Sequence, residues 1–123
     1  MRLSEEAFVE VVDEALQDLP EAFQSAMANV MVDVEPMPDR ETCRAIGIRN
    51  PRHLLGLYRG TPLTKRSVEH IAQLPDHITI YQHNIERVCR TRRRMIEQIR
   101  RTVFHEVGHH FGMDEQQLRE LGY

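Results

Sequence analysis

Residues 91–115, TRRRMIEQIRRTVFHEVGHHFGMDE, decide the fold because they combine a long apolar stripe with a polar face that carries histidines. Apolar side chains recur there at the three- and four-residue spacing of one helical face, which predicts a helix over residues 91–111. The stripe consists of Met95, Ile96, Ile99, Val103, Val107 and Phe111. Gly112 follows, where a helix commonly ends in the left-handed conformation. We expect residues 114–121 to form a last short helix.

The end of this predicted helix carries the pattern His-Glu-x-x-His, at His105, Glu106 and His109. Two histidines four residues apart project from the same face, so their imidazoles can share a metal ion at about 2.0–2.1 Å. Glu106 is rotated by roughly 60° from His109, where it borders the ion and can act as a base. The apolar stripe lies on the opposite side of the helix, which argues against two core histidines. The pattern therefore predicts a site for one Zn²⁺ ion.

A catalytic Zn²⁺ ion usually keeps three protein ligands and one open position, so a third ligand is expected. Gly112 lets the chain turn back toward the histidines, and two carboxylates, Asp114 and Glu115, follow at once. Either can complete the site. Glu115 is favoured because it lies six residues after His109, the third-ligand spacing of the extended motif, and Asp114 remains the alternative. His110 lies toward the apolar side and is expected to be packed or to support the ligands.

The N-terminal half predicts a helix followed by a strand. Ser4 and the two glutamates after it start a helix whose apolar positions continue to Leu19. Pro20 ends that helix or opens a short second one. Residues 30–34 alternate between apolar and polar faces, which is typical of a half-buried strand. Residues 39–53 are polar and without a clear period, so they are expected to form a surface loop.

The remaining segments predict two more strands, at residues 54–58 and 77–82, with a short helix at residues 64–72 between them. The order of helices and strands indicates an α+β domain in which a small sheet is backed by helices. A length of 123 residues fits a single domain spanning residues 1–123.

Charge and composition narrow the classes of function. The net charge of −3 argues against a surface that binds nucleic acid generally. Cys43 and Cys89 form no CxxC pair and are expected to be reduced thiols of a cytoplasmic protein. The N-terminus lacks the basic start and apolar run of a signal peptide. No stretch reaches the roughly 18 apolar residues of a membrane span, so a membrane partner is not expected.

Seven arginines between residues 87 and 101 form the other notable feature. They are Arg87, Arg90, Arg92, Arg93, Arg94, Arg100 and Arg101. They indicate either a solvated helix face or a surface for an anionic partner. Arg94 and Arg101 lie within about 40° of the His105 direction and can flank a cleft. Few aromatic residues accompany them, so nucleic acid is not the expected partner.

Three blocks of the chain resemble the minimal zincin-fold family, a set of small bacterial proteins with an extended HExxHxxGxx(D/E) motif. The blocks are LLGLYRGTPLTKRS (54–67), LPDHITIYQ (74–82) and VFHEVGHHFGMDEQQLRELGY (103–123). The resemblance implies a zincin-like domain reduced to its catalytic core, with His105, His109 and Glu115 on the metal and Glu106 as base. The family's third ligand is often Asp. The expected fold is a small, mostly antiparallel sheet of three or four strands, packed against an N-terminal helix and the long helix.

The favoured function is a zinc-dependent metallopeptidase that hydrolyses peptide bonds by a zinc-activated water, with Glu106 as general base. The substrate would be a peptide or protein, held as an added strand along a sheet edge. Candidates for stabilising the oxyanion are Tyr81, Tyr123, His77 and His83. The alternative is a non-catalytic zinc-binding domain that binds a peptide or protein. A third hypothesis is an arginine-dependent nucleic-acid binder in which the motif is incidental.

Overall fold

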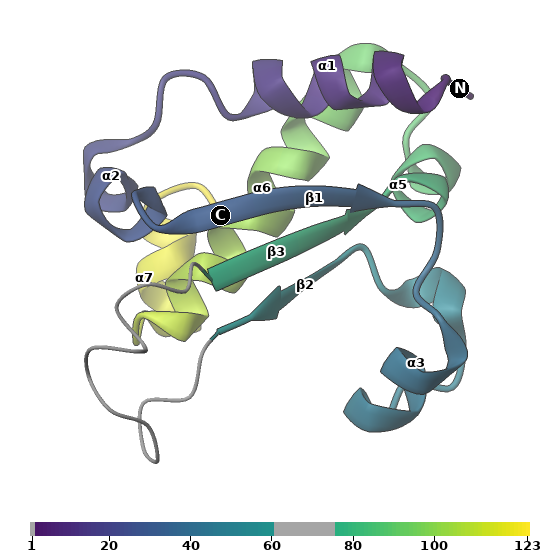
Figure 1. The fold of residues 1–123 in the computed structure, drawn as a ribbon. Helices are drawn as coiled ribbons and strands as arrows, with labels where there is room; N and C mark the ends of the chain where they lie inside the picture. The colour runs from purple at the N-terminus through teal and green to yellow at the C-terminus, as the bar shows by residue number, and fades with distance from the viewer. Residues whose placement is uncertain (1, 61–75) are drawn as a thin grey trace.

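The computed structural model describes residues 2–60 and 76–123. Its helices and strands follow one another as Figure 1 labels them. In chain order they are α1 (Glu5–Ala15), α2 (Glu21–Met27), β1 (Val30–Glu35), α3 (Arg40–Ile46), the 3-10 turn η1 (Pro51–His53), β2 (Gly56–Arg59), β3 (Asp76–Tyr81), α5 (Gln82–Val88), α6 (Arg92–His110) and α7 (Glu115–Glu120). The fold is α+β, as the sequence predicts.

The three described strands form one mixed sheet in the order β1-β3-β2. β1 runs parallel to β3, with Val30 opposite Asp76, and β2 runs antiparallel to β3, with Gly56 opposite Ile80. The expected sheet is mostly antiparallel, whereas one of the two pairings observed is parallel. The direction of the chain reverses from β1 to β2 and again to β3, so β3, inserted between them, runs parallel to β1. Figure 1 shows the two parallel strands above β2.

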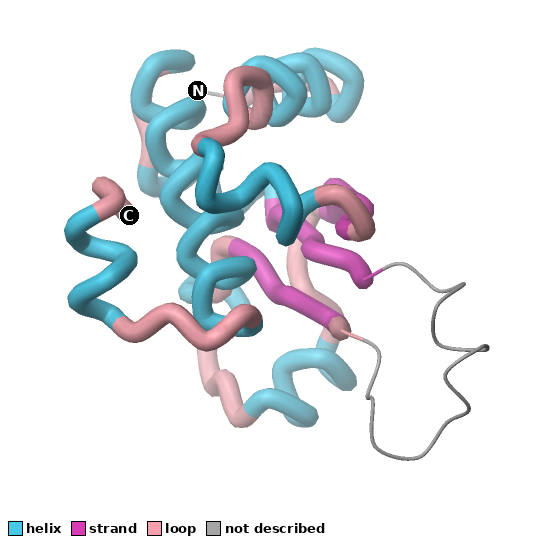
Figure 2. Tube along the Cα trace, turned by 90° about the vertical axis from the view of Figure 1, so that its left-hand side faces the viewer, coloured by secondary structure: helices cyan, strands magenta, loops and turns pink. Residues whose placement is uncertain are grey.

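The long helix α6 organises the core. Its N-terminus is capped by Thr91, whose hydroxyl accepts a hydrogen bond from the Arg94 amide at 3.1 Å. In Figure 1, α6 passes behind the sheet and α1 lies above β1. Figure 2 shows the same arrangement from the side, with α6 between the strands and α7. One side of α6 therefore faces the sheet, and its other side is available for the side chains of a functional site.

The apolar stripe predicted for α6 is confirmed except at its last member. Met95, Ile99, Val103 and Val107 are fully buried, whereas the Phe111 side chain is 53% exposed. Phe111 is the C-cap residue, where the backbone leaves the helix to enter a reversal, so helical spacing no longer predicts its direction.

Two short helices differ from the sequence-based expectation. Residues 39–53, expected to be a loop, contain α3 and η1. Asp39 caps α3 by accepting a hydrogen bond from the Thr42 amide at 2.7 Å, and Gly47 ends it with φ 77°. The chain also enters α5 directly at Gln82, the last residue of the predicted strand. At seven residues each, α3 and α5 are too short to show a period.

The helix predicted at residues 64–72 lies outside the described residues. Both cysteines are free, buried thiols. Among the helices of the two described ranges, none combines the length and the apolar character needed to cross a bilayer.

Candidate metal centre

A tight reversal follows α6 and returns the chain toward it. The Met113 amide donates to the Gly108 carbonyl at 2.8 Å, and the Gly112 amide donates to the His109 carbonyl at 3.1 Å. Gly112 has φ 90°, a left-handed conformation that glycine adopts without strain. These bonds form the Schellman motif that satisfies the last carbonyls of a helix. The predicted role of Gly112 in ending this helix is confirmed.

The next helix begins immediately after this reversal. Asp114 is the N-cap of α7, and its carboxylate accepts a hydrogen bond from the Gln117 amide at 2.8 Å. The Gln117 side chain accepts one in return from the Asp114 amide at 2.8 Å, which completes a capping box. The Asp114 carboxylate is thereby committed to the backbone of α7. Glu115 becomes the first residue of the helix, where a negative charge is favoured.

α7 is held against α6 by the buried side chain of Leu118. This side chain is fully buried and faces Gly108, the residue before His109. A Cβ atom built on Gly108 would lie 2.5 Å from Leu118 Cδ2, closer than two carbon atoms can approach. The absence of a side chain at Gly108 therefore lets α7 approach α6 closely enough to present Glu115 to the histidines.

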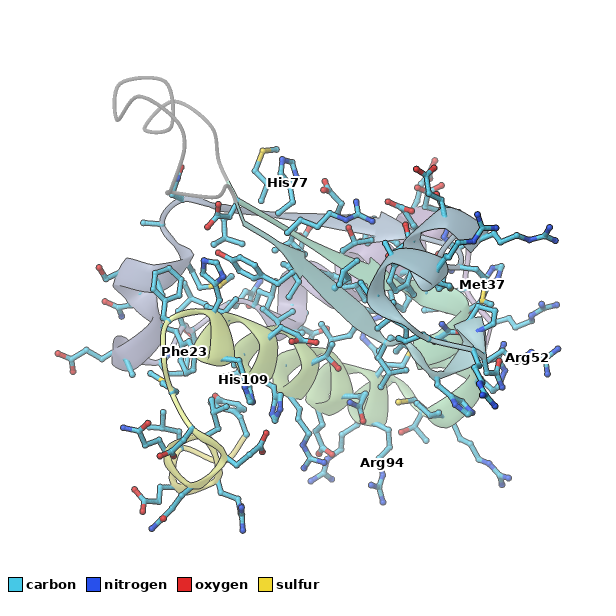
Figure 3. All side chains as sticks on the ribbon, turned by 90° about the horizontal axis from the view of Figure 1, so that it is seen from below. Phe23, Met37, Arg52, His77, Arg94 and His109 are labelled. Carbon is cyan, nitrogen blue, oxygen red and sulfur yellow. The ribbon has the colours of Figure 1, made fainter. Side chains whose placement is uncertain are left out.

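Three side-chain atoms converge beside α6. Nε2 of His109 lies 3.0 Å from Nε2 of His105 and 2.9 Å from Oε1 of Glu115. Nε2 of His105 lies 3.2 Å from the same Glu115 oxygen. Within the described ranges, these three residues form the one group of His, Cys, Asp and Glu side chains with metal-ligand spacing. Figure 3 shows His109 on α6, projecting away from the sheet.

The dimensions of this donor triangle fit a tetrahedral Zn²⁺ ion. Ligands at about 2.0–2.1 Å from a tetrahedral ion lie roughly 3.3–3.4 Å from one another. The three separations of 2.9, 3.0 and 3.2 Å are slightly shorter, and small side-chain rotations would open them. When both histidines carry their proton on Nδ1, each of the three atoms presents a lone pair to the other two, and one added proton can relieve only one of these contacts at a time. A divalent cation relieves all three contacts together, and two nitrogens with one oxygen are a donor set that zinc accepts.

The His105 ring is also oriented from its other side. Its Nδ1 atom lies 3.4 Å from the backbone carbonyl oxygen of Tyr123, a bond in which a protonated Nδ1 donates and Nε2 keeps its lone pair. The Tyr123 ring packs against Phe23 and Phe104 with centroid distances of 5.7 and 4.9 Å. Its hydroxyl accepts a bond from Arg100 at 3.3 Å. The residue that supports His105 is thus itself fixed to the core.

The histidine rings remain open to solvent. The His105 and His109 side chains are 33% and 41% exposed, so a metal ion and a small molecule can reach them. Both rings point toward one another and away from the apolar stripe. This is the arrangement that the spacing in the sequence predicts.

Glu106 lies in a cleft beside this triangle. The cleft has a volume of about 280 Å³ and is lined by His53, Leu54, Leu55, Gly56, Gln98, Arg101, Thr102, His105 and Glu106. Burial raises the pKa of the Glu106 carboxyl, and the nearby His105 and His109 oppose this only in part. Glu106 is not a member of the donor triangle. A carboxylate that is partly desolvated and not committed to a metal can take up a proton.

None of the four residues considered for the oxyanion lines the cleft. Tyr81 is fully buried, and Tyr123 packs in the core as described above. His77 contacts Asp33 across the sheet at 2.8 Å, and His83 lies on α5. The cleft instead contains His53, which no sequence pattern singles out because η1 brings it in.

His110 is not packed in the core. Its side chain is 40% exposed and stacks on the Tyr58 ring, with centroids 4.2 Å apart. Its Nε2 atom lies 3.7 Å from the Asp76 carboxylate. His110 therefore links α6 to the sheet and is not part of the core.

Several of the seven arginines of residues 87–101 are engaged locally. Arg92 forms an ion pair with Glu14 at 2.6 Å, and Arg93 forms one with Glu97 at 3.3 Å. Arg100 donates to the Ala15 carbonyl at 2.6 Å. Arg92 and Arg100 thereby tie α6 to α1, and Arg93 is paired within α6, so these three of the seven arginines have local partners.

Comparisons with known proteins identify the family of the chain. The zincin-like metallopeptidase family matches residues 27–123. The search of curated proteins found no match. A solved structure of a conserved hypothetical protein from T. thermophilus is similar, with a TM-score of 0.53 and 25% sequence identity, over 88% of this chain and 94% of that chain. The family match covers the donor triangle, Glu106 and the sheet, and the chain belongs to the zincin-like metallopeptidase family.

Proposed function

We propose that the chain is a zinc-dependent metallopeptidase in which His105, His109 and Glu115 hold one Zn²⁺ ion and Glu106 is the general base. The single observation that carries this proposal is the convergence of three lone-pair atoms within 3.2 Å of one another, next to a half-buried carboxylate. When bound, a zinc ion supplies a Lewis acid that polarises a carbonyl and makes a water molecule more acidic.

The residues of the chain supply the proton transfers and the orientation. Glu106 accepts a proton from the attacking water and delivers it to the leaving amine as the peptide bond breaks. Burial raises the pKa of Glu106, which supports the first step, because a stronger base accepts the proton from water more readily. The Tyr123 carbonyl holds the His105 ring so that Nε2 faces the donor triangle.

The substrate proposed is an extended peptide lying beside β2. In the described sheet, β2 pairs only with β3, so its other edge is available for an added strand. Gly56, the first residue of β2, and Leu55 before it line the same cleft as His105 and Glu106. A peptide added along this edge would therefore pass the base and the metal ligands.

Two observations favour a second candidate, a zinc-binding domain that binds peptides without cleaving them. The cleft volume of about 280 Å³ is at the lower limit of ligand pockets, which are typically about 300–1,000 Å³. The Glu115 side chain is also 58% exposed. Such a small, open site would orient the scissile bond poorly, so a bound peptide would be cleaved slowly or not at all.

Metal content and hydrolysis, measured on the same variants, separate the two candidates. For the peptidase, we expect about one zinc per chain in the wild type and in Glu106→Gln, hydrolysis of a mixed peptide library only by the wild type, and neither property in His109→Ala. His83→Ala, on α5, is the matched control and should behave as the wild type. Hydrolysis by Glu106→Gln at the wild-type rate would refute the proposed base. One zinc per chain without any hydrolysis would favour the binding domain.

A further inference from the structure

We propose that Arg101 makes the cleft selective for peptides with an acidic side chain within two residues of the scissile bond. This inference rests on the proposed function, because it concerns the substrate of the same site. Arg101 takes no part in the packing of α6, and the inference assigns it a role in binding the substrate.

Arg101 and the metal-facing histidine are neighbours on α6. Arg101 lies four residues before His105, one helical turn away, and both line the cleft that contains Glu106. The rise between them is about 6 Å along the helix axis. An extended peptide advances roughly 3.3–3.6 Å per residue, so a side chain one or two residues from the reacting carbonyl reaches the Arg101 guanidinium.

Arg101 and Glu106 flank His105 on opposite sides. On the helical wheel, Arg101 is rotated by about 40° from His105 in one direction and Glu106 by about 100° in the other. A substrate carboxylate that contacts Arg101 is therefore kept away from the negative charge of the base. Both interactions can form with the same bound peptide.

The guanidinium of Arg101 is available for a ligand. Arg101 is exposed, and it makes no hydrogen bond or ion pair with any residue of the ranges 2–60 and 76–123. Its neighbours differ, since Arg92, Arg93 and Arg100 each have a partner. An arginine with a local partner needs no ligand, whereas the five donors of Arg101 have no partner within the described part of the chain.

The lining of the cleft favours an acidic group over a basic one. Among the described lining residues, Glu106 is the one carboxylate and Arg101 is the one permanently charged cation. The lining also contains the apolar residues Leu54 and Leu55, which lower the local polarity and strengthen a charged contact. A guanidinium binds a carboxylate through two parallel hydrogen bonds, a geometry that an amide or ammonium group does not reproduce.

Internally quenched peptides of one backbone sequence test this inference. They carry Glu, Gln or Lys at a single position within two residues of the cleaved bond, and kcat/KM is measured for each. For the wild type we expect the Glu peptide to exceed the Lys peptide by about tenfold or more. Arg101→Gln should remove most of this preference, and Arg101→Glu should invert it.

The control is Arg93→Gln, the same substitution on the same helix. The Arg93 side chain is 89% exposed and does not line the cleft, so this variant should keep the wild-type preference. A wild type that cleaves Lys and Glu peptides equally, or a preference that survives Arg101→Gln, would overturn the role of Arg101.

A binding measurement separates failure of this inference from failure of the proposed function. Zinc-loaded Glu106→Gln, with and without Arg101→Gln, is titrated against the same peptides carrying a fluorescent label. Tighter binding of the Glu peptide that disappears with Arg101→Gln supports the inference even if no peptide is cleaved by the wild type. Equal affinity for the Glu and Lys peptides overturns it whether or not the protein is a peptidase.

Discussion

Gly108 and Leu118 set the distance between the two helices that carry the donor triangle. A Cβ atom on Gly108 would come within 2.5 Å of Leu118 Cδ2 and 3.4 Å of the Met113 sulfur. Leu118 is fully buried and cannot move aside without disturbing the core. The separation of α6 and α7 therefore depends on the absence of a side chain at Gly108, within the HExxH pattern. The position of Glu115 depends in turn on that separation.

Gly108→Ala is expected to weaken zinc binding. The added methyl group pushes α7 away from α6, so the Glu115 oxygen moves out of reach of the histidine nitrogens. Competition with a chromophoric chelator measures the affinity. Gly108→Ala combined with Leu118→Val, which makes room for the methyl group, should recover part of the loss. An unchanged zinc affinity in Gly108→Ala would show that this contact does not position Glu115.

Zinc is expected to stabilise the folded protein. A ligand that binds only the folded state at a free concentration of 100 times its Kd adds about 2.7 kcal/mol to the free energy of unfolding. Thermal melts with added zinc and with a chelator should therefore differ clearly for the wild type. His109→Ala should melt at the same temperature under both conditions. A zinc-induced shift of equal size in His109→Ala would place the binding elsewhere.

The stability of the metal-free protein should depend on pH through Glu106. Burial raises the pKa of this carboxyl in the folded state, so folding favours its protonated form. That contribution is fully present below the unfolded-state pKa and is lost as the pH rises through the folded-state pKa. Glu106→Gln carries no charge at any pH. Melts in chelator should show the variant gaining stability relative to the wild type from acidic to neutral pH, and parallel curves would contradict this.

Tyr58→Phe should destabilise the fold by about 1–2 kcal/mol, the usual cost of removing a partly buried hydrogen bond. The Tyr58 hydroxyl donates to the Asp76 carboxylate at 2.6 Å, and burial together with this carboxylate raises the Tyr58 pKa. Phe keeps the ring that stacks on His110, so Tyr58→Ala should cost more. Denaturant unfolding measures both variants, and an equal loss in the two would mean that the ring contact contributes little.

The long helix and the motif on it could be predicted from the sequence because their signals are local. The apolar stripe of α6 follows from helical spacing, and the common face of His105 and His109 follows from their separation by four residues. The end of the helix at Gly112 follows from the conformational freedom of glycine. Each of these depends on residues that are close in the chain, so no knowledge of the rest of the fold is required.

The sequence left the choice between two neighbouring carboxylates open. Asp114 and Glu115 both follow the turn, and spacing alone only favoured one of them. In the structure, the capping box occupies Asp114, and the packing of Leu118 on Gly108 sets the direction of Glu115. Their different positions thus result from contacts between helices that are separate in the chain.

By itself the sequence determined α6, its buried stripe, the two histidines with Glu106 and the reversal at Gly112. Only the tertiary structure decided that β1 and β3 run parallel, that η1 brings His53 into the cleft, and that Arg101 lines it beside His105. The physical reason is that helix periodicity and capping depend on neighbours within about four residues. Strand order and cleft lining depend instead on which distant segments bury their apolar faces against each other.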